Sequence, residues 1–459
     1  MILPFSPLLA VLVLLGVAFR VWQQHHRTIV RRPLNWGLAI LGVWLVITAA
    51  LAFDRLTALV GLFNFLPFFW LFAGLSALIQ APVQLRQLSW ALVLTSVPVM
   101  LIGLGQLFGG WAGHPQLLWI VLDLVIDRGG NPLGRMSSVF TYANVLASYF
   151  VMILPLAIGL WIESYQALPS ESISLLKLRQ LMARRQIPRS GPEKSAPLQQ
   201  LDVPQNQAWL RWALLSLLVV GDTIALILTD SRNAWAIAVL ACLAFALYQG
   251  WRWLVAGVGV IAGSVLWAAF GPAPTQPWFR AIVPAFFWAR LSDQRYPDRP
   301  VALLRVTQWR FAWSLTEQRP WTGWGLRNFT PLYQAQMHTF IGHPHNLVLM
   351  MTAETGIPAT LVLLGLVGWV MFRGVLLLRD WPNLFAQPVP RWTSDRLIFF
   401  SYLVAFGAST LFHLLDVTLF DARINILGWV LLSAICGLVY RQQAMLLQQK
   451  AIAADFEPS

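Results

Sequence analysis

Two histidines beside an apolar run are the residues whose type and spacing most clearly suggest chemistry. His343 and His345 stand two apart in a His-Pro-His-Asn stretch, directly before the apolar run that begins at Leu347. A histidine at the mouth of a helix is suited to proton transfer, because its unperturbed pKa lies near neutral pH. The same spacing could bind a metal, but zinc sites need three or four ligands with recognisable partners. The sequence offers no companion cluster, so we predict no metal site.

Arginines also stand where apolar runs begin or end. Arg232 lies in the turn 229–233 between two such runs, and its simplest explanation is a side chain that extends to the lipid headgroups. The alternative is a guanidinium that binds phosphate, because its fork of donors matches phosphate oxygens. Arg305 begins a stretch with helical spacing that also holds Arg310, and Arg135 precedes a further apolar run. The residues alone leave both explanations open.

Three other polar residues lie at or within apolar runs. Glu354 is inside the run that follows the histidines, where an ionisable group is costly and usually faces a cavity or a partner. Structural pairing or stabilisation of a helix end is the favoured explanation of Glu354, with direct substrate contact as the alternative. Asn346 completes the histidine stretch. Asn144 is a secondary candidate, for which a helix–helix hydrogen bond is slightly favoured over substrate binding.

The elements that must position these residues are membrane helices. Of 459 residues, 58% are hydrophobic and 11% charged, whereas soluble domains carry about 25% charged residues. A helix that crosses the hydrocarbon core needs roughly 20 apolar residues. Eleven runs are long enough, namely 3–22, 34–53, 56–79, 88–108, 140–162, 209–229, 233–250, 252–270, 346–372, 396–415 and 424–440. A twelfth apolar run, Leu117–Ile126, is too short to cross and could lie along the interface.

Arginine placement predicts the orientation of these runs. Basic residues concentrate after the first run, in 163–208, in 373–396 and after Arg441. Basic loops mark the cytoplasmic side, so the net charge of +13 reflects topology and does not predict nucleic-acid binding. The segments 109–139, 229–233 and 271–345 then fall on the opposite side of the membrane, and they contain Arg135, Arg232, Arg305 and His345. Cations gathered beside a histidine fit an anionic, lipid-linked substrate with a pyrophosphate group.

The sequence therefore predicts an all-α polytopic membrane protein with about 11–12 transmembrane helices and a long helical extracytoplasmic loop. Both cysteines, Cys242 and Cys436, lie inside apolar runs and imply neither a disulfide nor a metal framework. We divide the chain into N-terminal transmembrane helices (1–162), a flexible cytoplasmic linker (163–208), central transmembrane helices (209–270), an extracytoplasmic loop domain (271–345), C-terminal transmembrane helices (346–440) and a cytoplasmic tail (441–459).

Several short motifs together resemble the O-antigen ligase and polymerase superfamily of bacterial envelope proteins. They are Ser231-Arg232-Asn233-Ala234-Trp235, the stretch from Arg305 to Trp309, Pro320-Trp321-Thr322-Gly323-Trp324-Gly325, the His-Pro-His-Asn stretch, and Ala353-Glu354-Thr355-Gly356. The resemblance implies a metal-independent glycosyltransferase without a cofactor in the bacterial inner (plasma) membrane. Such enzymes move a glycan from undecaprenyl pyrophosphate to an acceptor hydroxyl on a lipid or glycan at the periplasmic face.

The resemblance also implies roles for individual residues. Arg232 and Arg305 match the arginines thought to hold the pyrophosphate, and His345 matches the histidine thought to activate or orient the acceptor hydroxyl. Asn233 departs from the commonest pattern, in which glycine follows the arginine, and this leaves the turn geometry open. We therefore predict His345, Arg232 and Arg305 as catalytic residues. The predicted substrate-binding residues are Arg135, His343, Asn346, Glu354 and Arg310.

Rival functions share parts of this pattern. A polysaccharide polymerase and a protein O-oligosaccharyltransferase use the same donor chemistry, and a ligase is favoured because the outer loop is compact. A transporter of bicarbonate or another solute would need ionisable residues or broken helices near the membrane midplane, whereas the conspicuous charges here gather at one face. A scaffold within an envelope-assembly complex is a third possibility. We expect membrane lipids, but no nucleic acid, among the partners.

Overall fold

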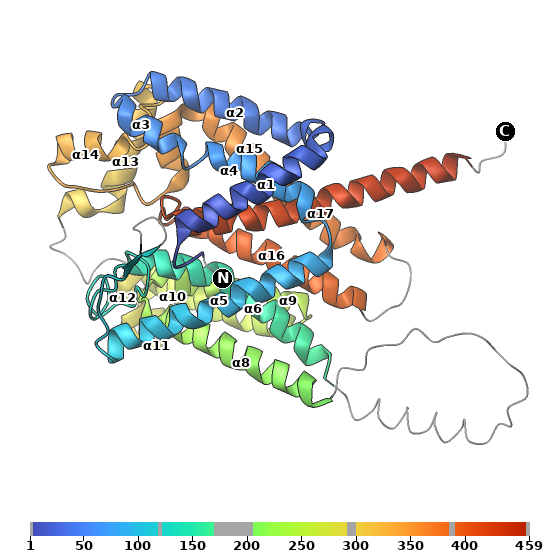
Figure 1. Cartoon of the computed structure of the whole chain (residues 1–459). Helices are drawn as coiled ribbons and strands as arrows, with labels where there is room; N and C mark the ends of the chain where they lie inside the picture. Colours follow the sequence, from blue (N-terminus) through green and yellow to red (C-terminus); the bar gives the residue numbers. More distant parts are fainter. Residues whose placement is uncertain (1–2, 118–121, 169–204, 292–299, 385–390, 456–459) are drawn as a thin grey trace, which may run out of the picture.

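The computed structural model describes residues 3–117, 122–168, 205–291, 300–384 and 391–455, which are almost entirely helical (Figure 1). The strands within these residues, β1 (Gln116–Leu117) and β2 (Leu122–Asp123), pair in antiparallel fashion. The described ends of the short run Leu117–Ile126 therefore belong to a small hairpin. The run is too short to cross a membrane, as predicted, and its position along the interface stays a prediction. The predicted all-α class is otherwise confirmed.

Ten helices in the described ranges are long and apolar enough to cross a membrane. They are α1 (Pro7–Val30), α2 (Pro33–Ala50), the pair α3 (Arg55–Leu62) and α4 (Leu66–Leu78), α5 (Pro82–Phe108), α6 (Ala143–Gln166), α8 (Gln205–Leu228), α10 (Arg252–Phe270), α15 (Leu347–Leu384), α16 (Arg391–His413) and α17 (Ala422–Asp455). An eleventh apolar helix, α9 (Arg232–Tyr248), has 17 residues, which is about the lower limit for crossing the hydrocarbon core. Each predicted apolar run thus corresponds to one helix or helix pair, and the polytopic membrane fold is confirmed.

Several helices are longer than the apolar runs that predicted them. Helix α15 continues to Leu384 and α16 begins at Arg391, so the predicted loop 373–396 is largely helical. Helix α17 extends through much of the predicted tail. Of the predicted linker 163–208, the ends belong to α6 and α8, and residues 169–204 lie outside the described residues. Polar residues continue these helices beyond the apolar stretch, which a hydropathy pattern does not detect.

Local sequence explains where the helices begin. Proline occupies the first turn of α1, α2 and α5, where its fixed φ suits the helix and its missing N–H costs nothing. Asp54 caps α3 by accepting a hydrogen bond from the backbone N–H of Thr57 at 3.2 Å. A polar capping residue therefore fixes where α3 begins, although the neighbouring helices α2 and α4 are apolar.

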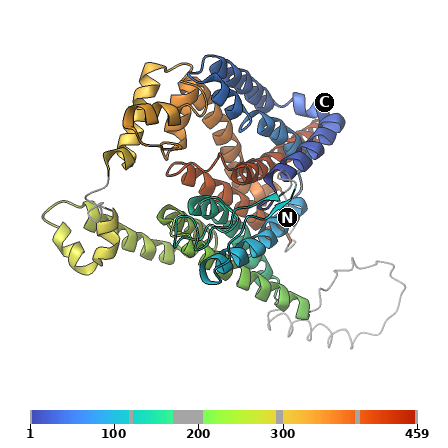
Figure 2. The ribbon, with the colours of Figure 1, turned by 60° about the vertical axis from the view of Figure 1, so that its left-hand side comes forward.

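Helices α6 and α17 are the most deeply buried of the long helices and form the centres of two neighbouring groups. Helix α6 packs against α5, α8 and α16, while α17 packs against α4, α15 and α16. Helix α16 therefore joins the two groups. Figure 1 shows α13 (Arg305–Gln318) and α14 (Phe329–Met337) at one end of the bundle, opposite the C-terminal end of α17. Figure 2 shows α10, α11 (Gln276–Ile282) and α12 (Ala285–Leu291) extending sideways from the bundle.

Helix α15 is interrupted at Gly356, and the segment Pro320–Gly325 fills the interruption. Gly356 has φ +81°, a backbone conformation that side chains rarely adopt. The carbonyls of Ala353 and Glu354 accept hydrogen bonds from the backbone N–H groups of Trp324 (2.9 Å) and Gly325 (2.8 Å). On the other side of the break, the N–H of Ile357 donates to the carbonyl of Pro320 at 2.8 Å. The inserted segment thus supplies the partners that a broken helix would otherwise lack.

We expect Gly356→Ala to destabilise the fold strongly. A Cβ atom at this position would lie 2.2 Å from the carbonyl oxygen of Trp321, and the positive φ adds about 1–3 kcal/mol of strain. Thermal unfolding of the purified protein in detergent should shift down by several degrees. Gly365→Ala is the matched control, because it lies in the same helix and its Cβ would meet nothing within 4 Å. Equal melting temperatures for the two variants would contradict this account of the interruption.

Candidate active site

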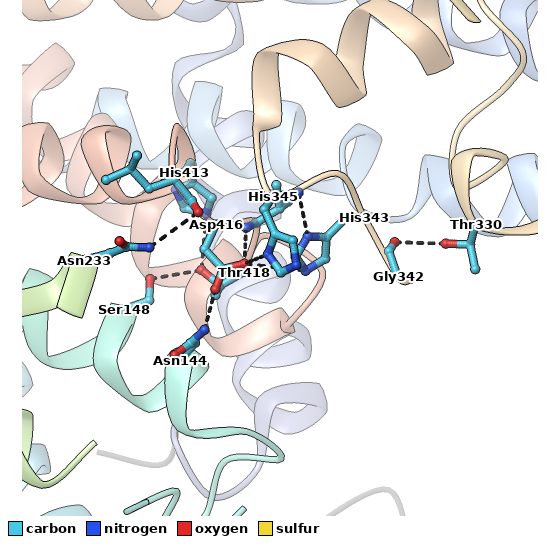
Figure 3. A network of polar contacts seen from close by, with 12 residues as sticks. Asn144, Ser148, Asn233, Thr330, Gly342, His343, His345, His413, Asp416 and Thr418 are labelled. Atoms are coloured by element: carbon cyan, nitrogen blue, oxygen red, sulfur yellow. Dashed lines mark hydrogen bonds and ion pairs between the residues drawn. The ribbon is translucent and has the colours of Figure 1, made fainter. Parts of the chain in front are cut away.

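The centre of the candidate site is Asp416, in the loop between α16 and α17 (Figure 3). Nδ1 of His345, which lies just before α15, is 2.8 Å from Oδ1 of Asp416. The Asp416 side chain is only 4% exposed, whereas that of His345 is 30% exposed. The imidazole therefore connects a buried carboxylate to the surface, as an acid–base group that meets a substrate must do.

The backbone around His345 is held in an uncommon conformation. His345 has φ +54°, and residues other than glycine in this region often mark functional sites. Asn346 fixes the following turn, because its Oδ1 accepts from the N–H of Leu349 at 3.0 Å and caps α15. Its Nδ2 donates to the carbonyl of Leu414 at 3.1 Å. Asn346 thus ties the histidine segment to the end of α16, beside Asp416.

His343 lies against His345 and is neutral at physiological pH. Its Nδ1 accepts a hydrogen bond from the backbone N–H of His345 at 3.2 Å, so the proton of the neutral ring is on Nε2. That nitrogen is 3.7 Å from Oδ1 of Asp416. Burial lowers the pKa of His343 to about 4, opposed by Asp416 and reinforced by neighbouring cationic groups, among them Arg305. His343 is therefore a neutral neighbour of the His345–Asp416 pair.

Asp416 is an ionised carboxylate despite its burial. Burial acts to raise its pKa, but the hydrogen bond from His345, the electrostatic interactions with the two histidines and the hydrogen bond from the Asn144 amide hold the pKa well below its ordinary range. An ionised carboxylate only accepts hydrogen bonds. The Nδ1 of His345 must then carry the proton it shares with Asp416, which leaves a lone pair on Nε2. This is the arrangement by which a carboxylate orients a histidine base.

Asn144 and Arg135 approach Asp416 from the start of α6. Nδ2 of Asn144 donates to Oδ2 of Asp416 at 2.6 Å, and Oδ1 of Asn144 accepts from Nη2 of Arg135 at 2.6 Å. Arg135 also donates from Nε to the carbonyl of Thr229, at the end of α8, at 2.8 Å. Asn144 thus bonds to two loop residues, which is not the helix–helix hydrogen bond that the sequence favoured. Arg135 donates two hydrogen bonds to protein groups.

Arg232 and Arg305 reach the same end of the bundle from other elements. Arg232 is the exposed first residue of α9, and the described residues offer its guanidinium no hydrogen bond or ion pair. The neighbouring Asn233 donates to the carbonyl of Leu415, next to Asp416, at 3.5 Å. Arg305, the half-buried first residue of α13, lies close enough to lower the pKa of His343. Arg310 is exposed on α13, one turn further along.

Glu354 has structural partners. It is 2% exposed, and its Oε1 accepts from the backbone N–H of Phe329 at 3.2 Å, at the start of α14. Its own carbonyl receives Gly325, as described above. These contacts favour the explanation that Glu354 stabilises a helix end, and substrate contact by Glu354 stays a prediction.

One group in the described part of the chain has the spacing of a metal site. Ligand atoms of His343, His345 and Asp416 all lie within 4.8 Å of one another, so Asp416 is the companion that the sequence did not reveal. The Nδ1 atoms of both histidines make hydrogen bonds within the protein, however. Nδ1 of His345 faces Asp416 in a hydrogen bond, and Nδ1 of His343 accepts from the His345 backbone. We interpret the group as a hydrogen-bonded triad.

Asp416 is the residue of the candidate site that reasoning from the sequence missed. It follows the apolar run 396–415 and precedes a second acidic residue, Asp421. The available signal was a carboxylate at the end of a membrane helix on the same side as the histidines. That signal was weak, because acidic residues often end helices without meeting a histidine.

The fold and the site together define a polytopic helical membrane protein with an acid–base pair and cations at one end of its helices. Residues 214–364, less than half of the chain, match the family model described as O-antigen ligase. This segment contains Arg232, Arg305 and His345, whereas Arg135, Asn144 and Asp416 lie outside it. No curated protein matches the chain.

Proposed function

We propose that this protein transfers a glycan from undecaprenyl pyrophosphate to an acceptor hydroxyl at the periplasmic face of the bacterial inner membrane. The observation that carries the proposal is the His345–Asp416 pair with a contact of 2.8 Å, placed beside helix ends that present Arg232 and Arg305. A base and two guanidinium groups are what a displacement of pyrophosphate by a hydroxyl requires. The basic loops at the other end of the helices support the periplasmic orientation.

The proposed reaction is a direct, inverting displacement at the anomeric carbon. The acceptor oxygen forms a bond to that carbon while the bond to the pyrophosphate oxygen breaks, and the electron pair leaves with the pyrophosphate. Nε2 of His345 takes the hydroxyl proton, and Asp416 stabilises the imidazolium that results. Arg232 and Arg305 stabilise the negative charge that grows on the leaving group. His343 and Asn346, which lie beside His345, are candidate substrate contacts, and so is Arg310, which is exposed on the same helix as Arg305.

We expect this reaction to proceed without a metal ion. The purified protein, reconstituted in liposomes with an undecaprenyl-pyrophosphate-linked glycan and an acceptor such as lipid A–core, should transfer glycan at the same rate after dialysis against EDTA. The physical reason is that the arginines supply the charge that a divalent ion would otherwise neutralise. The control is a metal-dependent glycosyltransferase treated identically. A rate that falls with EDTA and returns with one added divalent ion would contradict the triad interpretation.

The same residues would serve a ligase, a polymerase or a protein O-oligosaccharyltransferase, because all three share the donor. Deletion of the gene followed by analysis of surface glycans separates them. Accumulated lipid-linked glycan with an unmodified lipid acceptor supports a ligase, which we favour. Loss of long chains while single repeat units still reach the acceptor supports a polymerase. Loss of glycan from proteins alone supports the third activity.

A solute transporter is the second candidate, and one observation favours it. Asp222 is buried within α8, beside Ser96 of α5, and ionisable groups within membrane helices often mark ion or substrate pathways. The proposed transferase mechanism does not use this residue. Unchanged surface glycans together with lost bicarbonate uptake in the deletion strain would favour transport, and restoration of that uptake should then fail with Asp222→Asn.

A further inference from the structure

Asn144 lies between the guanidinium of Arg135 and the carboxylate of Asp416, and this position fixes the orientation of its amide. Figure 3 shows the contact with Asp416. A guanidinium has only donors, so the atom that faces Nη2 of Arg135 at 2.6 Å must be the amide oxygen. The amide nitrogen then faces Oδ2 of Asp416, also at 2.6 Å. Rotation of the amide by half a turn would place an N–H against Arg135 and an oxygen against the carboxylate.

Arg135 is itself held in place by the protein. Its Nε donates to the carbonyl of Thr229 at 2.8 Å, and the backbone N–H of the next residue, Met136, donates to the carbonyl of Leu228 at 2.9 Å. The loop before α6 is therefore fastened to the end of α8 by two hydrogen bonds. These bonds fix the orientation of the Arg135 guanidinium, which in turn fixes the orientation of the Asn144 amide.

The orientation of Asn144 completes a shell of donors around Asp416. Oδ2 receives the Asn144 amide, while Oδ1 receives the backbone N–H of Val417 at 2.9 Å and faces Nδ1 of His345. With donors on both oxygens, the carboxylate has no reason to hold a proton of its own. The proton between Asp416 and His345 then belongs to the imidazole Nδ1, and Nε2 is the atom that can accept a proton.

We propose that Asn144, oriented by Arg135, is a positioning residue that directs the lone pair of His345 Nε2 toward the acceptor hydroxyl. The inference rests on the proposed function, in which His345 is the base. It gives Arg135 a role different from the predicted one: the guanidinium acts on the reaction through Asn144 and Asp416 and does not bind the pyrophosphate. We call the series of contacts from Arg135 through Asn144 to Asp416 the relay, and its contact between Asn144 and Asp416 joins residues 272 positions apart in the chain.

Asn144→Asp tests the relay by changing one amide nitrogen to oxygen. Two carboxylates would then face each other across the Asn144–Asp416 contact, and such a pair holds one proton between them. At pH 8 the pair is largely ionised, Asp416 loses its donor, and we expect the transfer rate to fall by about 100-fold, the upper range for groups that orient a functional side chain. Near pH 5.5 the shared proton restores a donor, and the ratio of variant to wild-type rate should rise about tenfold.

The wild type and the variant share the other charged or titratable groups near this pair. Arg135 faces it from the loop before α6, His343 and His345 from the segment before α15, and His413 from the end of α16. Arg305 of α13 acts on it through His343. At each pH the rate of the variant is divided by the rate of the wild type. The titration of groups that both proteins share therefore cancels from this ratio. A variant that was merely misfolded would show a low ratio at every pH.

Asn35→Asp is the matched control, because Asn35 donates to the carbonyl of Ile29 at 2.8 Å at the opposite end of the bundle. Its rate ratio should not vary with pH. Should Asn144→Asp fail to fold, Arg135→Gln and Arg135→Lys provide the second measurement. Glutamine lets the Asn144 amide rotate and should slow transfer by about tenfold, whereas lysine keeps a donor and should recover part of the loss.

The outcomes separate this inference from the proposed function. An active wild type together with a ratio that rises in acid supports the relay. An active wild type with a ratio independent of pH, or with Arg135→Gln as active as wild type, overturns the relay and leaves the transferase proposal standing. A wild type without transfer activity in the reconstituted assay overturns the transferase proposal itself, and with it the role of the relay.

Discussion

Replacing His345 by alanine should slow glycan transfer by about 10³-fold, within the range for loss of a general base. The Asp416→Asn variant should lose about 10²–10³-fold, because asparagine can donate as well as accept. Nδ1 of His345 could then face a donor, and the proton would move to Nε2, the atom that must be free to accept. Both effects should appear in kcat, since neither side chain is proposed to hold the donor lipid.

The double variant distinguishes a working pair from two independent residues. If Asp416 acts only through His345, then His345→Ala with Asp416→Asn should be no slower than His345→Ala alone, as for residues that act as a unit. Rates are measured with the reconstituted protein and normalised to folded protein by thermal unfolding. His26→Ala, an exposed histidine in α1, is the control and should retain full activity. Multiplicative losses in the double variant would remove Asp416 from the proton-transfer step.

Most of the fold was predictable because a membrane helix requires an apolar run of about 20 residues, which is visible in the sequence. Hydropathy located every long helix, and the shortest, α9, was included although its 17 residues are near the limit. The pattern failed where polar residues continue a helix, as at the ends of α15 and α17. It gave no secondary structure for Leu117–Ile126, whose described ends pair as strands, because a run of about ten apolar residues does not distinguish helix from strand.

The site was predictable only in its local parts. His345 and Arg232 stand out because polar groups beside apolar runs are rare in such a chain. Asp416 is 71 positions from His345, and no sequence period connects the end of one helix with the start of another. Its partnership depends on how α15 and α16 pack, which is a tertiary property. The Asn144 relay depends in addition on the direction of an amide, which no residue pattern encodes.

Two of the motifs that supported the family resemblance, Pro320–Gly325 and Ala353–Gly356, lie against each other in the structure. The Pro320–Gly325 segment lies in the break of α15 at Gly356, and a Cβ on Gly323 would lie 2.4 Å from the carbonyl carbon of Glu354. These glycines are required because two backbones approach closely. The insertion also fixes the start of α14 through Glu354. The motif therefore shapes the platform from which α13 presents Arg305, and its tryptophans need no direct part in chemistry.

Arg232 and Arg305 should each prove irreplaceable by lysine. We expect alanine at either position to slow transfer by about 10²–10³-fold, the loss measured for single groups that stabilise developing negative charge. Lysine keeps the charge but lacks the planar fork that contacts two phosphate oxygens at once. Lysine variants should therefore remain at least about tenfold below wild type. The loss should appear mainly in kcat, because charge on the leaving group grows as the glycosidic bond breaks.

Arg252→Lys is the matched control for Arg232→Lys. Both arginines are exposed and begin a membrane helix, α10 and α9 respectively, but successive helices run in opposite directions, so Arg252 lies at the far end. A side chain that only reaches for lipid headgroups tolerates lysine, which extends in the same way. Equal activity of both lysine variants would therefore identify Arg232 as a membrane anchor. A loss confined to Arg232→Lys, with unchanged thermal stability, would instead require phosphate recognition at the first turn of α9.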